Sequence, residues 1–479
     1  MSELHRNYIA GEWIAGTEAA RNINPSDVTD VVGEYARADR AQADSAIAAA
    51  RRAFPAWSHS SVQDRANLLD AVGNALLSRK DELGRLLSRE EGKTLPEGVG
   101  EVARAGQIFK FFGGEALRLA GEKIPSVRPG VDVEVTREPV GVVGIITPWN
   151  FPIAIPAWKI APALCYGNCV VFKPAELVPG SAWALSEIIV NAGVPAGVFN
   201  FVMGRGSVVG ETMINDPRVD AISFTGSVAT GHAIAEKAIK RMAKLQLEMG
   251  GKNPLVVLDD ADLAVAVNCA VNGAYFSTGQ RCTASSRLIV GTGIHDRFVA
   301  ALSERLAKLK VDDALAPGTE IGPVVDETQL KQDLEYIGIG QREGAKLAYG
   351  GEILKRDKRG HYLAPALLTE ATNAMRTSRE EIFGPVASVI RVKDYDEALA
   401  VANDTDFGLS AGIVTSSLKH ASHFKRESQA GMIMVNLPTA GVDYHVPFGG
   451  RKGSSYGPRE QGRYAREFFT VVKTAYTMP

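Results

Sequence analysis

The feature that most constrains the fold is an alternation of short Val- and Ile-rich runs with longer amphipathic segments, which begins near Val131. Each apolar run is followed by a turn that contains Gly, Pro or Ser, and then by apolar residues at helical spacing. This alternation predicts βα units, in which parallel strands form a sheet and helices cover it. The first set of predicted strands covers residues 142–146, 169–172, 198–203 and 221–224.

A second set with the same pattern follows Glu248. It predicts strands at residues 254–258, 287–290, 386–390 and 412–415, and helices at residues 296–310, 327–343 and 395–403. Two such sets predict an α/β protein with two domains, each built around a parallel sheet. The expected break between them lies near residues 249–252, Met-Gly-Gly-Lys.

The two ends of the chain differ from this pattern. The first 120 residues show helical spacing, most clearly at residues 41–54 and 65–87, and predict a helical lead-in. Residues 468–476 form an apolar run that is typical of a strand. This strand either pairs with another subunit, because a free apolar edge is a liability, or pairs within its own chain.

The composition indicates a folded chain of more than one domain, since roughly 100–200 residues per domain would divide 479 residues into two to four. The 53 Lys and Arg against 55 Asp and Glu give a net charge of -2 without a basic block, so we expect no nucleic-acid partner. The longest apolar run, residues 140–146, is far shorter than the ~20 residues of a membrane span, and residues 1–6 are polar. We therefore expect a cytoplasmic protein without a leader or a membrane partner.

The cysteines and histidines predict neither a disulfide framework nor a metal site. Four cysteines in 479 residues are too few for such a framework, and no Cys-x-x-Cys pair is present. His420 and His423 share a helical spacing, but no third ligand stands out, so a solvated helix face is the favoured interpretation. The remaining question is whether one thiol is reactive among Cys165, Cys169, Cys269 and Cys282.

Cys282 has the sequence context of a reactive thiol. It lies in the polar, Gly-containing segment 276–284, whereas the other three cysteines have apolar neighbours that suit buried structural thiols. Arg281 directly before it is expected to favour the thiolate by its charge. From these residues alone, Cys282 is either a nucleophile or a small buried hydrophobic residue.

Two strand ends carry further candidate groups. Glu248 precedes a Gly-Gly turn at the carboxyl edge of a predicted sheet, where it is either a general base or a solvated acid. Asn150 lies between Pro148 and Pro152. A rigid turn of this kind either holds the Asn150 amide as an oxyanion donor or simply anchors aromatic core residues.

Two segments suit a nucleotide, and a third nearly matches a dinucleotide motif. Ser227 follows a predicted strand and begins a predicted helix, so its hydroxyl and the helix N–H groups suit a phosphate or form an ordinary N-cap. Lys173 and Glu176 follow another strand and suit ribose hydroxyls, or they form a surface pair. Residues 204–210 miss the Gly-x-Gly-x-x-Gly spacing by one residue and carry little weight.

Taken together, these motifs resemble the aldehyde dehydrogenase superfamily nearly from end to end. A Glu that precedes a Gly-Gln-x-Cys cysteine by 34 residues, as Glu248 precedes Cys282, is highly specific to that family. The matching segments, in family order, are residues 148–152, 173–176, 224–227, 247–254, 279–282 and 381–385.

The resemblance implies oxidation of an aldehyde to a carboxylic acid by covalent catalysis. Cys282 would be the nucleophile that carries a thiohemiacetal and then a thioester, and Glu248 the general base for hydrolysis. The Asn150 side chain and the Cys282 backbone N–H would form the oxyanion hole. Glu248 argues against a CoA-acylating relative, and the absence of a His near Cys282 in the sequence argues against a cysteine hydrolase.

The resemblance also implies NAD or NADP as the cofactor and no metal. Glu176 would accept hydrogen bonds from a free ribose 2′-OH and repel a 2′-phosphate, which favours NAD, while Lys173 would still tolerate NADP. The implied contacts are Lys173 and Glu176 at the adenosine ribose, Ser227 at the pyrophosphate, Trp149 near the adenosine, and Glu381 with Phe383 at the nicotinamide ribose and ring.

The fold implied is the aldehyde dehydrogenase fold, with two open parallel-sheet α/β domains and a small β oligomerisation arm. An NAD(P)-binding domain would comprise residues 1–120 and 138–249, and a catalytic domain residues 250–455. The bridging arm would comprise residues 121–137 and 456–479 and join the subunits of a homodimer or homotetramer.

Within the superfamily, residues 279–287 and 436–450 look like those of the α-ketoglutarate semialdehyde (2,5-dioxopentanoate) dehydrogenases. Arg281 would pair with the distal carboxylate of such a substrate, while Arg287 is either a second partner or structural. Phe151 and Trp158 would form apolar walls of the pocket. Succinate semialdehyde or another small aldehyde is the nearest alternative substrate.

Overall fold

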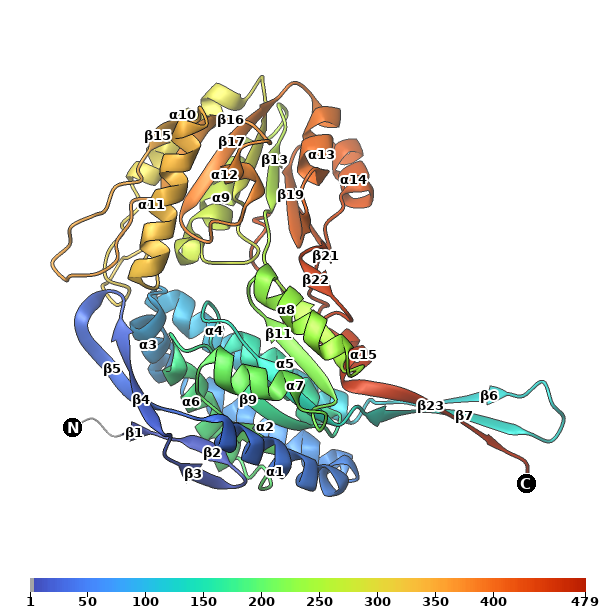
Figure 1. Ribbon diagram of the computed structural model, residues 1–479. Helices are drawn as coiled ribbons and strands as arrows, with labels where there is room; N and C mark the ends of the chain where they lie inside the picture. The colour runs from blue at the N-terminus through green and yellow to red at the C-terminus, as the bar shows by residue number, and fades with distance from the viewer. Residues whose placement is uncertain (1–3) are drawn as a thin grey trace.

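An eight-stranded sheet forms the centre of the first lobe of the structure, a computed structural model that describes residues 4–479 (Figure 1). Its middle strands β12, β11, β8, β9 and β10 are parallel and lie between layers of helices. Short antiparallel strands extend both edges. The order is β22-β12-β11-β8-β9-β10-β2-β3, with β2 Asn7–Ile9, β3 Glu12–Ile14, β8 Val142–Ile146, β9 Cys169–Lys173, β10 Phe199–Phe201, β11 Ala221–Thr225, β12 Lys244–Glu248 and β22 Ser455–Tyr456.

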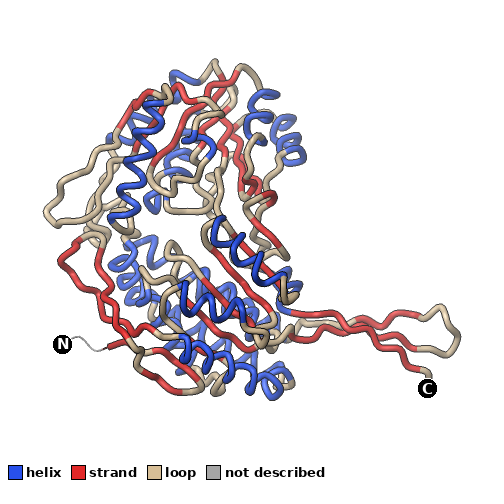
Figure 2. The backbone as a smooth tube through the Cα atoms, in the orientation of Figure 1, coloured by secondary structure: helices blue, strands red, loops and turns tan. Residues whose placement is uncertain are grey.

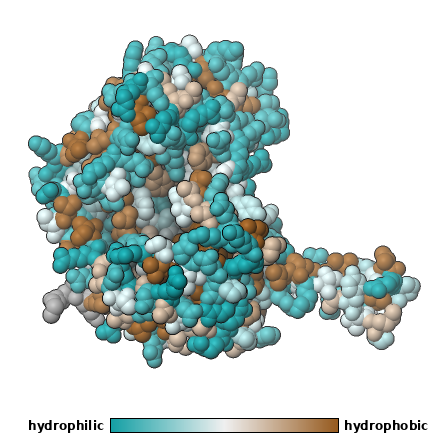
Figure 3. All heavy atoms as spheres, in the orientation of Figure 1, coloured by the Kyte–Doolittle hydropathy of each residue, from teal (hydrophilic) through white to brown (hydrophobic). Residues whose placement is uncertain are grey.

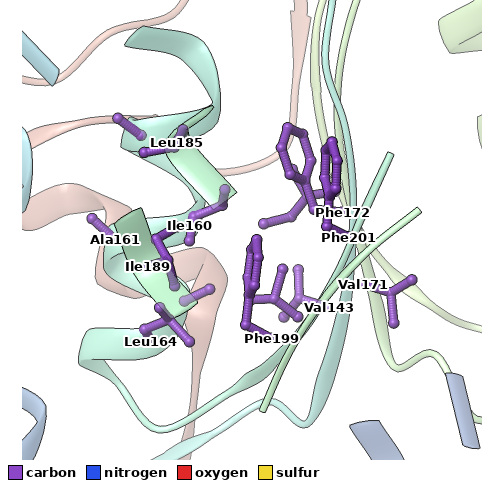
Figure 4. Close-up of a cluster of buried hydrophobic side chains, with 14 of the residues drawn as sticks. Val143, Ile160, Ala161, Leu164, Val171, Phe172, Leu185, Ile189, Phe199 and Phe201 are labelled. Atoms are coloured by element: carbon purple, nitrogen blue, oxygen red, sulfur yellow. The ribbon is translucent and has the colours of Figure 1, made fainter. Parts of the chain in front are cut away.

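Helices pack against this sheet and form the first hydrophobic core with it. Asp39 caps α1, and Thr94 with Glu97 forms a capping box at the start of α4. Figure 4 shows part of the core, in which aromatic rings of β9 and β10 lie opposite aliphatic side chains of α5 and α6. The helices are α1 Arg40–Ser58, α2 Val62–Ser78, α3 Lys80–Glu91, α4 Leu95–Ala116, α5 Ala154–Cys165, α6 Pro179–Asn191, α7 Glu211–Asn215 and α8 Val228–Ile239.

A seven-stranded sheet forms the second lobe, with the order β15-β16-β17-β14-β13-β19-β20. Strand β15 (Lys346–Tyr349) is antiparallel to its neighbour, and the other neighbouring pairs are parallel. The expected α/β class with two open, mainly parallel sheets is confirmed. The other strands are β13 Pro254–Val257, β14 Arg287–Gly291, β16 Ala366–Ala371, β17 Val386–Val392, β19 Ser410–Val414 and β20 Met432–Val435, and the helices are α9 Leu263–Ala274, α10 His295–Ala307, α11 Glu327–Arg342, α12 Arg376–Arg379, α13 Tyr395–Asn403 and α14 Leu418–Glu427.

Three antiparallel strands form an arm that projects from the first lobe (Figure 1, Figure 2). The middle strand β7 (Asp132–Pro139) pairs on one side with β6 (Glu122–Pro125) and on the other with the C-terminal β23 (Thr470–Thr477). The sequence left open whether the last strand pairs with another subunit or within its own chain. In the structure, it pairs within its own chain.

The expectation of a helical lead-in is wrong for the first part of the chain. Residues 4–37 form strands: β2 and β3 join the large sheet, while β1 (Leu4–His5), β4 (Glu18–Asn24) and β5 (Asp27–Arg37) form a small sheet of their own. Such short strands depend on pairing partners more than on local preference, which explains why helical spacing misled the prediction. The helix predicted at residues 65–87 is also broken at Arg79, which separates α2 from α3.

The structure also moves the boundary of the predicted arm. Strand β22 pairs with β12, and Phe468 and Phe469 are buried in the first core, so residues 456–469 pack on the first lobe. Of the predicted C-terminal part of the arm, residues 456–479, the segment that pairs with the other arm strands is β23. Residues 1–3 of the predicted NAD(P)-binding domain lie outside the described residues, and the roles of the two lobes stay predictions. Within residues 4–479, each helix is too short or too polar to cross a membrane.

Candidate active site

Two adjoining cavities meet at Cys282, which together with Ile155 lines both of them. We call them the first cavity, of about 280 Å³, and the second cavity, of about 250 Å³. The first is lined by ends of first-lobe strands and by second-lobe loops, including Trp149, Asn150, Ser227, Glu381 and Phe383. The second is lined by Arg104, Phe151, Trp158, Arg281 and Phe448, among others. Most of the sequence-predicted site residues therefore line the two cavities that meet at this thiol, whereas Glu248, Lys173 and Glu176 are not among the lining residues.

The loop that carries Cys282 is held in a constrained conformation. Ser277 and Thr278 have φ values of 51° and 57°, and Gly279 follows with 65°. A side chain on Gly279 would lie 2.2 Å from the carbonyl oxygen of Gly384, so only glycine fits there. Left-handed conformations in consecutive non-glycine residues are costly and persist where the surroundings fix them, as at functional sites.

Asn253 fixes the loop after the thiol. Its Nδ2 donates hydrogen bonds to the carbonyl oxygens of Cys282 and Ala284, at 2.7 and 3.0 Å. Its Oδ1 accepts from the Ser410 N–H at 3.0 Å. Because Asn253 begins the connection into β13, these bonds tie the thiol loop to the parallel sheet of the second lobe.

The surroundings of Cys282 favour the neutral thiol in the resting enzyme. Burial, followed by the negative charges of Glu381 and Glu248, raises the pKa of the Cys282 thiol well above its ordinary value. The Arg281 charge does favour the thiolate, as expected, but burial and the two carboxylates outweigh it. The Arg281 guanidinium also donates to Glu97 Oε1 at 3.1 Å and to Ser277 Oγ at 2.8 Å. A base must remove the thiol proton before Cys282 can attack.

Glu248 is a buried carboxyl rather than a solvated strand-end acid, with 3% of its surface exposed. It is the last residue of β12, and its Oε2 accepts a hydrogen bond from the Ser455 hydroxyl at 2.5 Å. Burial raises the pKa of Glu248 well above its ordinary value; nearby Glu460 raises it further, while the Ser455 hydrogen bond and the charge of Lys159 lower it. A buried carboxyl with a raised pKa beside a reactive thiol is a candidate general base.

A buried polar chain lies behind Glu248, and sequence reasoning missed it. The Lys159 ammonium forms an ion pair with Glu460, and both side chains are fully buried. The Lys159 Nζ also donates to Ser223 Oγ at 2.9 Å, and that hydroxyl donates to Gln246 Oε1 at 2.9 Å. The available sequence signal was Lys159 itself, a cation inside the otherwise apolar helix α5.

The Asn150 amide has one hydrogen bond and a remaining donor. Its Nδ2 donates to the Gln280 carbonyl oxygen at 2.9 Å. An amide nitrogen carries two N–H groups, so one is left for a ligand in the first cavity, which Asn150 and Cys282 both line. This arrangement agrees with an oxyanion-hole role.

A buried charge pair holds the Asn150 loop from the side of α4. The Lys93 ammonium donates to the Asn150 carbonyl oxygen at 2.6 Å and to Glu101 at 2.8 Å. Glu101 also accepts from the backbone N–H groups of Ile153 and Ala154, at 3.0 and 3.1 Å. These contacts fix the turn between β8 and α5, and the sequence motifs gave no sign of them.

The first cavity contains hydrogen-bond donors of a kind that suits a dinucleotide. The buried hydroxyl of Thr225, at the end of β11, has no partner among the described residues. Ser227 caps the N-terminus of α8, and the two Gly residues 226 and 250 leave the backbone open to a ligand. Glu381 accepts from the Gly251 N–H at 2.8 Å, and burial raises its pKa to about 7. Trp149 and Phe383 form an edge-to-face pair on the wall.

Lys173 ends β9 and Glu176 follows three residues later; the Lys173 carbonyl oxygen accepts from the Thr147 N–H at 3.3 Å. Burial lowers the pKa of Lys173 to about 8, and its Nζ donates to the Pro174 carbonyl oxygen at 2.8 Å. Glu176 accepts from the Gly206 N–H at 3.2 Å, so the segment 204–210, given little weight in the sequence, packs against a predicted cofactor residue. Arg37 lies 3.7 Å from the Glu176 carboxylate, a contact that sequence reasoning missed.

Phe151 and Trp158 line the second cavity, as the sequence predicted for a substrate pocket. The Trp158 ring stacks on Phe448, with ring centres 5.4 Å apart. Arg287 is not part of this wall: it is fully buried in the second lobe and donates to three backbone carbonyls and to the Asn373 side chain. Its role as a second carboxylate partner is therefore wrong, and its structural role is confirmed. Within residues 4–479, no cluster of three metal-ligating side chains is present.

The sequence model of the aldehyde dehydrogenase family matches residues 13–475. The chain belongs to the aldehyde dehydrogenase family. It is therefore an oxidoreductase that acts on aldehydes with NAD or NADP, as its motifs predicted.

Relatives of this aldehyde dehydrogenase match it along nearly its whole length. It is 43% identical to the alpha-ketoglutaric semialdehyde dehydrogenase of Bacillus subtilis, over 99% of this chain and 98% of the relative. It is 44% identical to the alpha-ketoglutarate semialdehyde dehydrogenase of Haloferax volcanii, over 99% of each chain. The crystal structure of betaine aldehyde dehydrogenase from Staphylococcus aureus with NAD+ matches with a TM-score of 0.96 and 35% identity, over 99% of this chain and 94% of that one.

Proposed function

We propose that this aldehyde dehydrogenase oxidises α-ketoglutarate semialdehyde (2,5-dioxopentanoate) to 2-oxoglutarate, with NAD or NADP as the acceptor. The observation that carries the proposal is the second cavity, where apolar walls and two arginines surround Cys282. Such a cavity suits a short aldehyde that ends in a carboxylate. The names of relatives that are 43% and 44% identical support the same substrate.

In the proposed mechanism, a base removes the Cys282 proton and the sulfur adds to the aldehyde carbon, which forms a thiohemiacetal. The free N–H of Asn150 and the backbone N–H of Cys282 stabilise its oxyanion; loss of one such donor typically costs about 2.7–4 kcal/mol. The nicotinamide ring supplies the hydride acceptor when the dinucleotide is bound. Loss of hydride from the reacting carbon leaves a thioester on Cys282. Glu248 then takes a proton from water, whose oxygen attacks the thioester and releases the acid.

We assign the dinucleotide to the first cavity and its margin, where Ser227 would meet the pyrophosphate and Trp149 the adenosine side. Glu381 and Phe383 would meet the nicotinamide ribose and ring, and Lys173 with Glu176 the adenosine ribose. Glu176 favours NAD, because its carboxylate accepts hydrogen bonds from a 2′-hydroxyl and repels a 2′-phosphate.

The cofactor assignment is tested by Glu176→Ala. Removing this carboxylate releases Arg37, so we expect the ratio of kcat/KM for NADP to that for NAD to rise about tenfold. Glu18→Ala is the matched control, since it removes an exposed acid that pairs with Arg205 near the same segment. An unchanged cofactor ratio in Glu176→Ala would remove Glu176 from the ribose site.

The substrate is tested with a kinetic panel of 2,5-dioxopentanoate, succinate semialdehyde and uncharged aldehydes, with NAD and with NADP. We expect the highest kcat/KM for 2,5-dioxopentanoate, an acid product without added CoA, and no activity in Cys282→Ala. A clear preference for succinate semialdehyde would establish the nearest alternative. Ester turnover that needs no NAD(P) would instead favour a cysteine hydrolase.

The arm supports a proposal about assembly: we expect a homodimer or homotetramer. Strand β23 is an edge of the arm sheet, and Val472 and Tyr476 on it are exposed apolar side chains, as is Ile124 on β6. Figure 3 shows apolar residues along the arm. An exposed apolar edge favours pairing with another chain. Light scattering should find an oligomer for the wild type and smaller species for Val472→Lys with Tyr476→Lys; a wild-type monomer would contradict the proposal.

A further inference from the structure

One arginine of the second cavity was not singled out by any sequence motif. Arg104 lies on α4, and its side chain lines the second cavity together with Cys282 and Trp158. The Arg104 guanidinium carbon lies 5.7 Å from the centre of the Trp158 ring, close enough for a cation–π contact that orients it. The cation and the reactive thiol therefore share one cavity.

Arg104 retains donors for a ligand. Its Nη2 donates to Gln461 Oε1 at 3.2 Å, and its buried Nε has no partner among the described residues. The nearest acid on its own helix, Glu101, is already bonded to Lys93 at 2.8 Å and to two backbone N–H groups. Asp443, on the loop beside the cavity, contributes a negative charge near Arg104 but forms no ion pair with it within 4 Å in the described chain. A guanidinium has five N–H donors, so most of those on Arg104 stay open.

The neighbouring Arg281 also has a buried Nε without a partner in the described chain, but more of its other donors are bonded. Arg281 forms an ion pair with Glu97 at 3.1 Å and donates as well to Ser277 Oγ and to the Asn272 carbonyl oxygen. Its charge is already balanced by a carboxylate that also holds the Cys282 loop. An incoming carboxylate would therefore compete with Glu97 at Arg281 but not with any bonded acid at Arg104.

We propose that Arg104, rather than Arg281, binds the distal carboxylate of the substrate and so determines the preference for ω-carboxylate aldehydes. This inference rests on the proposed function, in that the preferred substrate carries a carboxylate. Gln461 acts as a positioning residue, because its amide oxygen holds one edge of the guanidinium and leaves the rest directed to the ligand. The backbone of Gln461 has a φ of 58°, which is uncommon for a residue other than glycine.

The proposal is tested with a matched pair of aldehydes, succinate semialdehyde and butanal, which differ in the terminal carboxylate. In Arg104→Gln, we expect kcat/KM for succinate semialdehyde and for 2,5-dioxopentanoate to fall about 100-fold, mainly through a higher KM. The kcat/KM for butanal should change less than about threefold, because butanal makes no contact that needs the charge. Arg118→Gln, at an exposed position just after the end of α4, is the control and should leave kcat/KM unchanged for both aldehydes.

Arg104→Lys keeps the charge but loses the planar guanidinium. Its kcat/KM should fall about tenfold for the carboxylate aldehydes and stay unchanged for butanal. This variant decides the question if Arg104→Gln fails to fold. Equal losses for butanal and the carboxylate aldehydes, or no loss for either, would overturn the role of Arg104. A wild-type enzyme that prefers butanal would instead overturn the proposed function, whatever the variants do.

Discussion

The Ser455 hydroxyl donates a hydrogen bond of 2.5 Å to Oε2 of Glu248, across the short antiparallel pairing that joins β22 to β12. The two residues are 207 positions apart in the chain. The same hydroxyl accepts from the Gly450 N–H at 2.6 Å, which fixes its orientation. This contact stabilises the ionised form of a buried carboxyl whose pKa is otherwise raised by burial and by Glu460.

Removal of that hydroxyl should shift the pH dependence of the enzyme to higher pH. Because burial raises the pKa of Glu248, the fraction of active carboxylate and the rate of thioester hydrolysis should both rise with pH. Ser455→Ala removes a group that lowers this pKa, so the rising limb of the kcat profile should move up by about one pH unit. In a Glu248→Gln background, Ser455→Ala should produce no such shift. If the pH profile shifted equally in the Glu248→Gln background, the shift would belong to a group other than Glu248.

The buried pair Lys93 and Glu101 should contribute to both stability and rate. Each side chain is 2% exposed, so Lys93→Met leaves Glu101 buried without its cation and should lower the free energy of unfolding by about 3–5 kcal/mol. The kcat should fall as well, because Lys93 holds the Asn150 backbone. Denaturant unfolding and steady-state kinetics measure the two effects. The double variant Lys93→Met, Glu101→Met should be less destabilised than the sum of the single changes; strict additivity would contradict the coupling.

Because of Asp333 in α11, the free energy of unfolding should decrease as the pH rises. It is fully buried, accepts from the Gln329 side chain at 2.8 Å, and has a second oxygen without a partner in the described chain. Burial raises its pKa to about 8, so between pH 4 and 8 the folded state holds a proton that the unfolded state has lost. Relative to Asp333→Asn, the wild type should lose up to about 1.4 kcal/mol of unfolding free energy per pH unit in this range. Exposed Asp357→Asn is the control, and parallel pH curves for wild type and Asp333→Asn would contradict the assignment.

The parts of the site that the sequence predicted are local. Glu248 ends a strand and Asn150 follows one, and parallel strands bring such ends to one edge of a sheet; Cys282 was recognised from the polar loop before β14. Ser455 could not be predicted, because its contact depends on a two-residue strand that pairs with a distant segment. The N-terminal strands were missed for the same reason, since their pairing partners define them.

The sequence did not predict that the polar face of α4 is turned toward the active site. Glu97, Glu101 and Arg104 are spaced by four and three residues, so they lie on one side of the helix. On a surface helix such charges face solvent, and the sequence alone does not distinguish this from a charged face turned toward an active site. Arg281 shows a different case: its charge acts on the thiol as its position suggested, but its side chain also forms an ion pair with Glu97 that the sequence did not reveal.

The central claim is that Cys282 forms the covalent intermediates and that Glu248 hydrolyses the thioester. Rapid mixing of Glu248→Gln with NAD and 2,5-dioxopentanoate tests it most directly. We predict a burst of about one NADH per active site, followed by turnover at least about 100-fold slower than wild type, and no burst in Cys282→Ala. Steady turnover of Glu248→Gln at the wild-type rate, or a burst in Cys282→Ala, would contradict the account.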